Sequence, residues 1–268
     1  MNAGNPQRAR QIADEVLASP TADDTAVAWA ASAASLCAAR MGRFADVEPM
    51  AARASDAEHP GLLRFTVGLA QTTTRLMSDD VDQAAQVAQQ YTDFAELQQP
   101  GRAIGEVLLA HVRLATGELA SAAELLGPAS ATLERTGYSW GPLSLTLLAT
   151  ALAQLGDLAG SAKVLSRAES RHSTKSALFA PELGLARAWR LMAGRDGHGA
   201  LAAARQAAGM AERSGQFAVA VQCWHDAVRL GDTRALGPLE RVAAQADCAF
   251  SRNAVQEARE LGTTQSGE

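Results

Sequence analysis

Apolar residues recur along this chain at helical spacing, in blocks that short polar turns separate. In residues 61–77, for example, Leu62, Phe65, Leu69 and Leu76 fall on one side of a helix. The same kind of pattern predicts five more helices of similar length. They cover residues 25–41, 102–116, 143–155, 180–193 and 216–230.

A turn and a second, alanine-rich helix follow each of these segments. LGDLAGSAKVLSRA (155–168) matches TGELASAAELLGPA (116–129), and each has an alanine twelve residues after its glycine. Weaker copies place turns near residues 42, 79, 117, 156, 197 and 231, which are 34 to 41 residues apart. This spacing is typical of helix-turn-helix solenoids. We therefore predict an all-α, right-handed α-solenoid of about six divergent repeats, each made of a helix A, a turn and a helix B.

The repeats form one predicted domain over residues 1–262, because no long linker divides them. Residues 6–18 read as the helix B of a partial repeat with no helix A in front, which is typical of a segment of a longer protein or of a chain that has lost its flanking domains. We expect a last helix over 250–261 and a disordered tail at 263–268.

Composition narrows the class of protein. The chain has 268 residues, of which 47% are hydrophobic but only 4% aromatic, so small aliphatic side chains must form a helical core. The net charge of -5 argues against a broad nucleic-acid-binding surface. Three cysteines give no disulfide framework, and the N-terminus has no signal-peptide pattern, so we expect a cytoplasmic protein. No apolar run is long enough to span a membrane.

Few residues suggest chemistry. Gly156-Asp157 could bind an anion at a helix start, but its recurrence along the chain favours a repeat turn. Cys223 and His225 are two residues apart on a helix, so their side chains point apart. Since no nucleophile, base and orienting group can be assembled, we predict no catalytic residue, no cofactor and no metal, and a protein that is not an enzyme.

A set of arginines suggests a binding surface. Arg64 and Arg75 are eleven residues apart and share a helix face, and Arg102 and Arg113 repeat this spacing in the next helix A. Stacked on a concave wall, such arginines would bind an acidic peptide or an anionic ligand. A solvated face with local salt bridges is the alternative. The candidate set also includes Gln71, Glu106, Arg187 and Arg190.

The few aromatic residues allow two interpretations. Tyr138 and Trp140, in GYSWGP, are expected to fill the junction between two repeats, and a ligand-facing role is the alternative. Trp29, Trp189 and Trp224 lie on predicted A helices, where packing in the core is expected.

A glycine turn followed by a helix with alanine at fixed spacing resembles the tetratricopeptide repeat (TPR). GELASAAELL, GDLAGSAKVL and VQEARELG (255–262) are similar to the helical-repeat region of MalT-like, ATP-binding regulators of the LuxR family, which are abundant in actinobacteria. The resemblance implies a place between an ATPase module and a DNA-binding helix-turn-helix. The chain has neither a Walker A sequence nor that DNA-binding motif, so alone it is expected neither to hydrolyse ATP nor to bind DNA.

The resulting hypothesis is a non-enzymatic sensor and interaction domain of a transcriptional regulator. It would bind a protein, a peptide or a small effector in the concave groove and relay that event to neighbouring modules. Two alternatives stay open: a free-standing scaffold, and a receptor with a small molecule inside the superhelix. The oligomeric state is also open, a homo-oligomer included.

Overall fold

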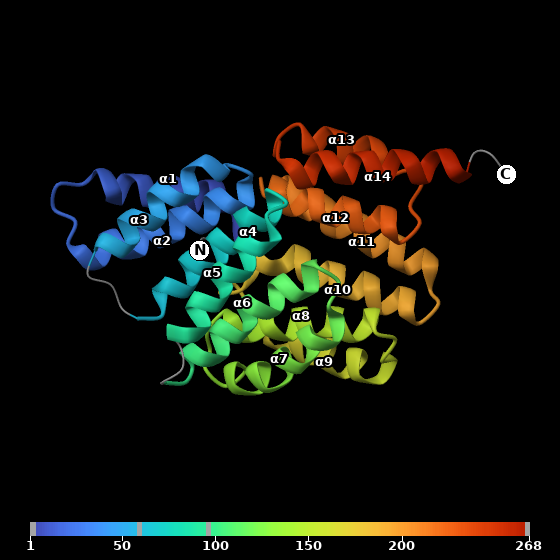
Figure 1. Ribbon diagram of the computed structural model, residues 1–268, viewed down its shortest axis with the longest axis horizontal. Coiled ribbons are helices and arrows are strands. Elements are labelled where there is room, and N and C mark those ends of the chain that lie inside the picture. Colours follow the sequence, from blue (N-terminus) through green and yellow to red (C-terminus); the bar gives the residue numbers. More distant parts are fainter. Residues whose placement is uncertain (1–3, 58–60, 95–97, 266–268) are drawn as a thin grey trace.

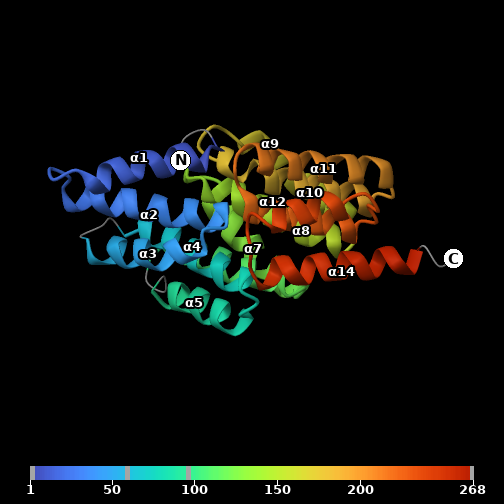
Figure 2. The same ribbon diagram turned by 90° about the horizontal axis from the view of Figure 1, so that it is seen from above.

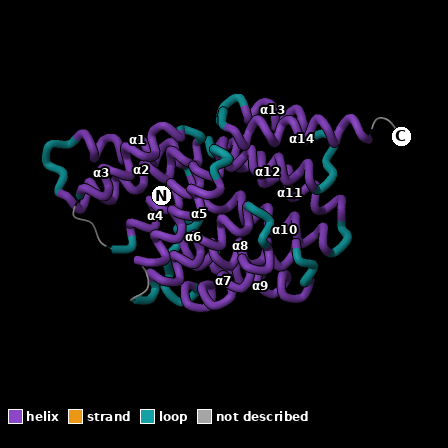
Figure 3. Tube along the Cα trace, viewed as in Figure 1, coloured by secondary structure: helices purple, strands orange, loops and turns teal. Residues whose placement is uncertain are grey.

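The computed structural model describes residues 4–57, 61–94 and 98–265, and within them the chain is all-helical (Figures 1 and 3). None of the helices in these ranges is long and apolar enough to cross a membrane. The α-helices are α1 (Pro6–Ala18), α2 (Asp24–Met41), α3 (Val47–Asp56), α4 (Leu63–Met77), α5 (Val81–Phe94), α6 (Gly101–Ala115), α7 (Leu119–Leu133), α8 (Trp140–Gln154), α9 (Leu158–Arg171), α10 (Ala180–Ala193), α11 (Gly197–Arg213), α12 (Phe217–Arg229), α13 (Leu236–Ala243) and α14 (Ala249–Gln265). Short 3₁₀ helices η2 (Phe44–Asp46) and η3 (Ala177–Phe179) precede α3 and α10.

The helices pair into consecutive antiparallel hairpins, which confirms the predicted solenoid. Even-numbered helices from α2 to α12 are A helices, and each packs against the odd-numbered helix B that follows it. From α5 onward, each helix B also packs against the next helix A. Among the described residues, α1 stands before the first hairpin as a helix B, and α14 follows the last hairpin as a helix A.

Left-handed residues form the A–B turns of the hairpins. Gly42, Gly117, Gly156 and Gly231 have φ between 79° and 92°, a conformation in which glycine carries no steric penalty. Asp79 takes the same role with φ 60°.

The turn predicted at Gly197 is centred two residues earlier. Arg195 is the left-handed residue there, with φ 64°, and Gly197 is already the first residue of α11. The position is set by the cap, because the Asp196 carboxylate accepts the backbone N–H of Gly199 at 2.8 Å. The left-handed residue must precede that cap.

Asp157 caps α9 in the same way. Its carboxylate accepts the backbone N–H of Gly160 at 2.9 Å, so the donor that an anion would need is already used. The geometry therefore confirms that Gly156-Asp157 is a repeat turn.

The C-terminal helix is longer than predicted. Residues 263–265 belong to α14, so the predicted disordered tail is wrong for them. Each residue added to a formed helix gains a backbone hydrogen bond, which allows α14 to continue beyond Ala258, a residue that is still buried. Residues 266–268 lie outside the described part of the chain.

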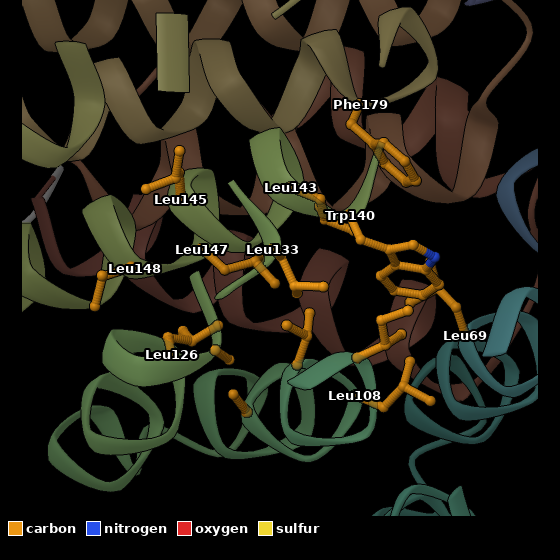
Figure 4. Close-up of a cluster of buried hydrophobic side chains, with 14 of the residues drawn as sticks. Leu69, Leu108, Leu126, Leu133, Trp140, Leu143, Leu145, Leu147, Leu148 and Phe179 are labelled. Atoms are coloured by element: carbon orange, nitrogen blue, oxygen red, sulfur yellow. The ribbon is translucent and has the colours of Figure 1, made fainter. Parts of the chain in front are cut away.

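The largest core cluster lies between the A and B helices of the middle repeats. Figure 4 shows leucines of α4 and α6 to α8 gathered around Trp140, with Phe179 of η3 above them. Glycines let the helices approach closely here: a Cβ on Gly141 would lie 2.8 Å from the Leu133 carbonyl oxygen of α7. Small residues at helix crossings thus take the place of the aromatic residues that this sequence lacks.

The superhelix closes on itself. Helix α12 contacts α2, and α14 contacts α4, so the ends of the first and last hairpins meet in the middle of the molecule (Figures 1 and 2). Asn253 of α14 donates a hydrogen bond to the Asp79 carboxylate at 3.1 Å. This closure limits how much of the A-helix surface stays open to a partner.

Candidate functional site

The predicted arginine set consists mostly of residues that pair with carboxylates of this chain. Arg75 of α4 lies 3.1 Å from Glu48 of α3, and Arg187 of α10 lies 2.5 Å from Glu169 of α9. In both cases the arginine of a helix A reaches the preceding helix B. These contacts match the alternative in which the arginines form local salt bridges on a solvated face.

The pairs on α6 are local as well. Arg102 lies 3.2 Å from Glu106 one turn later, and Arg113 pairs with Glu118 in the following turn. Both pairs are partly exposed, and surface pairs of this kind stabilise a fold by at most about 1 kcal/mol.

The remaining predicted polar residues do not form a continuous stripe. Gln71 donates to Glu48 at 2.9 Å and accepts from the Tyr91 hydroxyl at 3.1 Å. Arg64 donates to the Gly61 carbonyl at 2.8 Å, and Arg190 is half-buried on α10. A partner-binding role for this set stays a prediction.

The two loop aromatics separate. Trp140 is buried in the core cluster, as expected for a residue at a junction between repeats. Tyr138 is 49% exposed beside a shallow polar pocket with Ser139 and Arg171, so its predicted packing at the junction is wrong. The first turn of α8 directs Trp140 inward, whereas Tyr138 lies in the loop before it.

An apolar groove lies over the N-terminal half of α2. Its volume is about 460 Å³, with α1 as one wall and the start of α4 as the other. The lining includes Ile12 and Val16 of α1, Trp29 and Ala33 of α2, and Leu63 and Thr66 of α4. None of the lining residues carries a charge.

Trp29 is the most exposed large apolar residue of the described chain, at 56%, and Ile12 is 39% exposed across the groove from it. The expectation that Trp29 packs in the core is therefore wrong. The other two tryptophans of that prediction do pack inward: the Trp189 indole donates to Asp226 at 3.1 Å and that of Trp224 donates to Glu212 at 2.7 Å.

A buried polar cluster holds the closure of the superhelix. Arg40 of α2 is 5% exposed. Its guanidinium lies 2.7 Å from the Glu182 carboxylate, donates to the Gln216 side chain at 2.6 Å and to the Leu178 carbonyl at 2.8 Å, and stacks over the Phe179 ring. A single arginine thereby ties α2 to η3, α10 and the start of α12. These partners lie 138 to 176 residues away in sequence, so only the folded chain reveals the cluster.

The titratable groups around this cluster are held neutral. Burial lowers the pKa of His111 on α6 to about 4, and it raises the pKa of the Cys223 thiol well above its usual value. Burial likewise raises the pKa of Cys37 to about 11. A protonated, buried thiol is a poor nucleophile. His225 does not join Cys223, because its ring lies 2.7 Å from Glu257 of α14 and against Phe250.

No family model matches the sequence, and a search of the curated proteins finds no match. Solved structures do resemble the chain. A Rap protein in complex with competence and sporulation factor superposes with a TM-score of 0.65 and 13% identity, over 97% of this chain and 72% of that one. Kinesin light chain TPR-like repeats of Podosopora anserina superpose with a TM-score of 0.42 and 15% identity, over 76% of this chain and 97% of that one. The first likeness shows the fold: this chain is an α-solenoid of TPR-like helical repeats.

Proposed function

We propose that this chain is a non-enzymatic protein-interaction domain that binds its partner in the apolar groove of α1, α2 and α4. The observation that carries the proposal is the joint exposure of Trp29 and Ile12 on one uncharged groove. Leu155 and Leu158 are also exposed, but they flank the Gly156 turn and line none of the larger hollows described above. Apolar side chains that gather in a groove are typical of interaction sites.

The size of the groove fits this role. Covering the exposed parts of Trp29 and Ile12 would stabilise a complex by on the order of 2 to 3 kcal/mol, which is the contribution of one binding hot spot. Tryptophan is enriched at such hot spots. The Rap protein of similar fold is described in complex with competence and sporulation factor, which supports a helical-repeat array of this kind as a binding scaffold.

We further place the interaction in a transcriptional regulator of the MalT-like, LuxR-family type. The support is the resemblance of GELASAAELL and GDLAGSAKVL to the repeats of that family. The reading frame of the source gene tests this part: an upstream ATPase and a downstream helix-turn-helix are expected, and their absence would leave a free-standing scaffold.

Two variants, each with several substitutions, test whether partners bind in the groove or on the arginine set. The groove variant combines Ile12→Ser with Trp29→Ala, and the arginine variant replaces Arg64, Arg75, Arg102 and Arg113 by alanine. Proteins that co-purify with the tagged chain from its source cells are identified by mass spectrometry, and circular dichroism confirms that both variants fold. We expect specific partners that the groove variant loses and the arginine variant keeps.

The other outcomes are equally informative. Loss of partners only in the arginine variant would move the site away from the groove. A wild-type chain with no specific partner would contradict an interaction function, and ATP hydrolysis by the purified chain would contradict the non-enzymatic part.

A further inference from the structure

We infer that a polar pocket between two neighbouring loops binds the phosphate group of a small molecule. The loops are residues 134–139, which lead from α7 into α8, and residues 172–176, which lead from α9 into η3. The pocket lies in the middle of the chain and shares no lining residue with the apolar groove. The inference therefore goes beyond the proposed function and does not depend on it.

The pocket has the size of a small-molecule site. Its volume is about 340 Å³, within the range of about 300 to 1,000 Å³ that is usual for ligand pockets. Tyr138 and Ser139 line it from the first loop, Ser173 and Lys175 line it from the second, and Arg171 lines it from the end of α9. Two segments from successive repeats thus face one another across a hollow of polar side chains.

Both loops are anchored from behind. Ser176 is fully buried. Its hydroxyl accepts the backbone N–H of Ser173 at 3.0 Å and lies 3.1 Å from Nδ1 of His172. The first loop ends at Trp140 and the second leads to Phe179, and Figure 4 shows both of these rings in the core cluster. The walls are therefore in place before a ligand arrives, which lowers the entropic cost of binding.

The pocket carries an excess of positive charge. Glu134 is the one acidic residue of its lining, and two arginines share it: Arg167 at 2.5 Å and Arg171 at 3.5 Å. The hydrogen bond from Arg167 lowers the pKa of Glu134, so its carboxylate stays ionised and engaged. Lys175 is exposed and forms no ion pair within the described chain. Three positive charges against one negative match a phosphate monoester, which carries about −1.5 to −2 at pH 7.

Hydrogen-bond donors of this pocket are open to a ligand. The Arg171 guanidinium has five N–H groups, and its contact with Glu134 is long. Ser139 lies at the cap position of α8, but its hydroxyl does not bond to the first turn of that helix. This hydroxyl and the positive end of the α8 dipole therefore stay available to an anion. A phosphate group, with three acceptor oxygens, can use donors from both loops.

Tyr138 adds a second feature for recognition. Its ring lines the pocket and is 49% exposed. A planar group attached to the phosphate would cover this ring, and stacked aromatic rings attract one another. We therefore expect an aromatic phosphate monoester to bind more tightly than inorganic phosphate.

Isothermal titration calorimetry on the full chain, in buffer free of phosphate, tests the inference. The probes are inorganic phosphate, phenyl phosphate and, as a carboxylate of similar shape, benzoate. Phenyl phosphate should bind saturably at one site, more tightly than inorganic phosphate and at least tenfold more tightly than benzoate. Tyr138→Ala should remove its advantage over inorganic phosphate.

The two lysines of the chain provide a matched pair of variants. Lys175→Met removes the unpaired cation of the pocket and should weaken phenyl phosphate binding at least tenfold. Lys163→Met removes the other lysine, which is exposed on α9 outside the pocket, and should leave binding unchanged. Both changes alter the net charge of −5 equally, so a difference between them reports the pocket itself. Circular dichroism confirms that both variants fold.

Specific outcomes would overturn the inference. Absence of saturable binding by either phosphate probe would remove the site. Equal losses in Lys163→Met and Lys175→Met would assign binding to the general charge of the surface, and equal affinity for benzoate and phenyl phosphate would exclude selection of a phosphate group. The groove variant with Ile12→Ser and Trp29→Ala should bind phenyl phosphate like the wild type, so this inference and the proposed function fail separately.

Discussion

Arg40 offers the sharpest test of how the superhelix is held closed. Replacing it with methionine keeps the aliphatic stem and its packing over Phe179 but removes the guanidinium. The Glu182 carboxylate then loses its cation, and the Gln216 and Leu178 oxygens each lose a donor. The side chains of Arg40 and Glu182 are only 6% and 21% exposed, so water can replace few of these lost interactions.

The expected loss follows from that burial. Removing one member of a buried ion pair destabilises a protein by about 3 to 5 kcal/mol, whereas replacing both members by apolar residues is often close to neutral. We therefore expect Arg40→Met to lower the free energy of unfolding by about 3 kcal/mol. The double variant Arg40→Met with Glu182→Met should recover most of that loss.

Urea unfolding followed by circular dichroism measures all four members of this cycle, and small-angle scattering reports whether the first and last hairpins separate. A loss below about 1 kcal/mol for Arg40→Met, or strictly additive single losses, would refute the idea that this pair holds the closure.

Three further predictions concern single positions. Gly156→Ala should cost about 1 kcal/mol by urea unfolding, from the left-handed φ alone, since beyond its chain neighbours no described atom lies within 4 Å of the added Cβ. Gly42→Ala should cost at least twice as much, because its Cβ would also lie 2.6 Å from that of Ala246; equal losses would mean that this contact relaxes. For His111 the folded pKa is about 4 against 6.5 when unfolded. The unfolded chain therefore binds the extra proton first as the pH falls, and stability falls between about pH 6.5 and 4. Over that pH range the free energy of unfolding of the wild type should fall by up to about 3 kcal/mol more than that of His111→Gln, and parallel pH profiles would contradict this.

The repeat structure was predictable because it depends on local rules. A left-handed residue such as Gly156 and the cap Asp157 leave the same short signature wherever the chain turns from helix A to helix B. The turn predicted at Gly197 was placed two residues too late, because the left-handed residue there is Arg195, and an arginine does not mark a turn in the sequence. The turn before α1 was not predicted either. There Gly4 is the left-handed residue, and the cap is Asn5, an asparagine in place of the usual aspartate.

The site was less predictable because the sequence does not say which face of a helix is covered. The spacing of Arg64 and Arg75 shows that they share a face, but not that Glu48 of the preceding helix lies beside Arg75. Trp29 has the pattern of a core residue, but it lines the apolar groove beside α1 and is exposed there. The partners of Arg40 are too distant in sequence for any periodicity to connect them.

Site-specific photo-crosslinking tests the central claim most directly. A benzoylphenylalanine is placed at position 29 in the groove and, as the matched control, at Tyr138, which is similarly exposed. Irradiation in the source cells should join position 29 to a partner and should give no such adduct from position 138. Equal adducts from position 138, or none from position 29, would contradict binding in the groove.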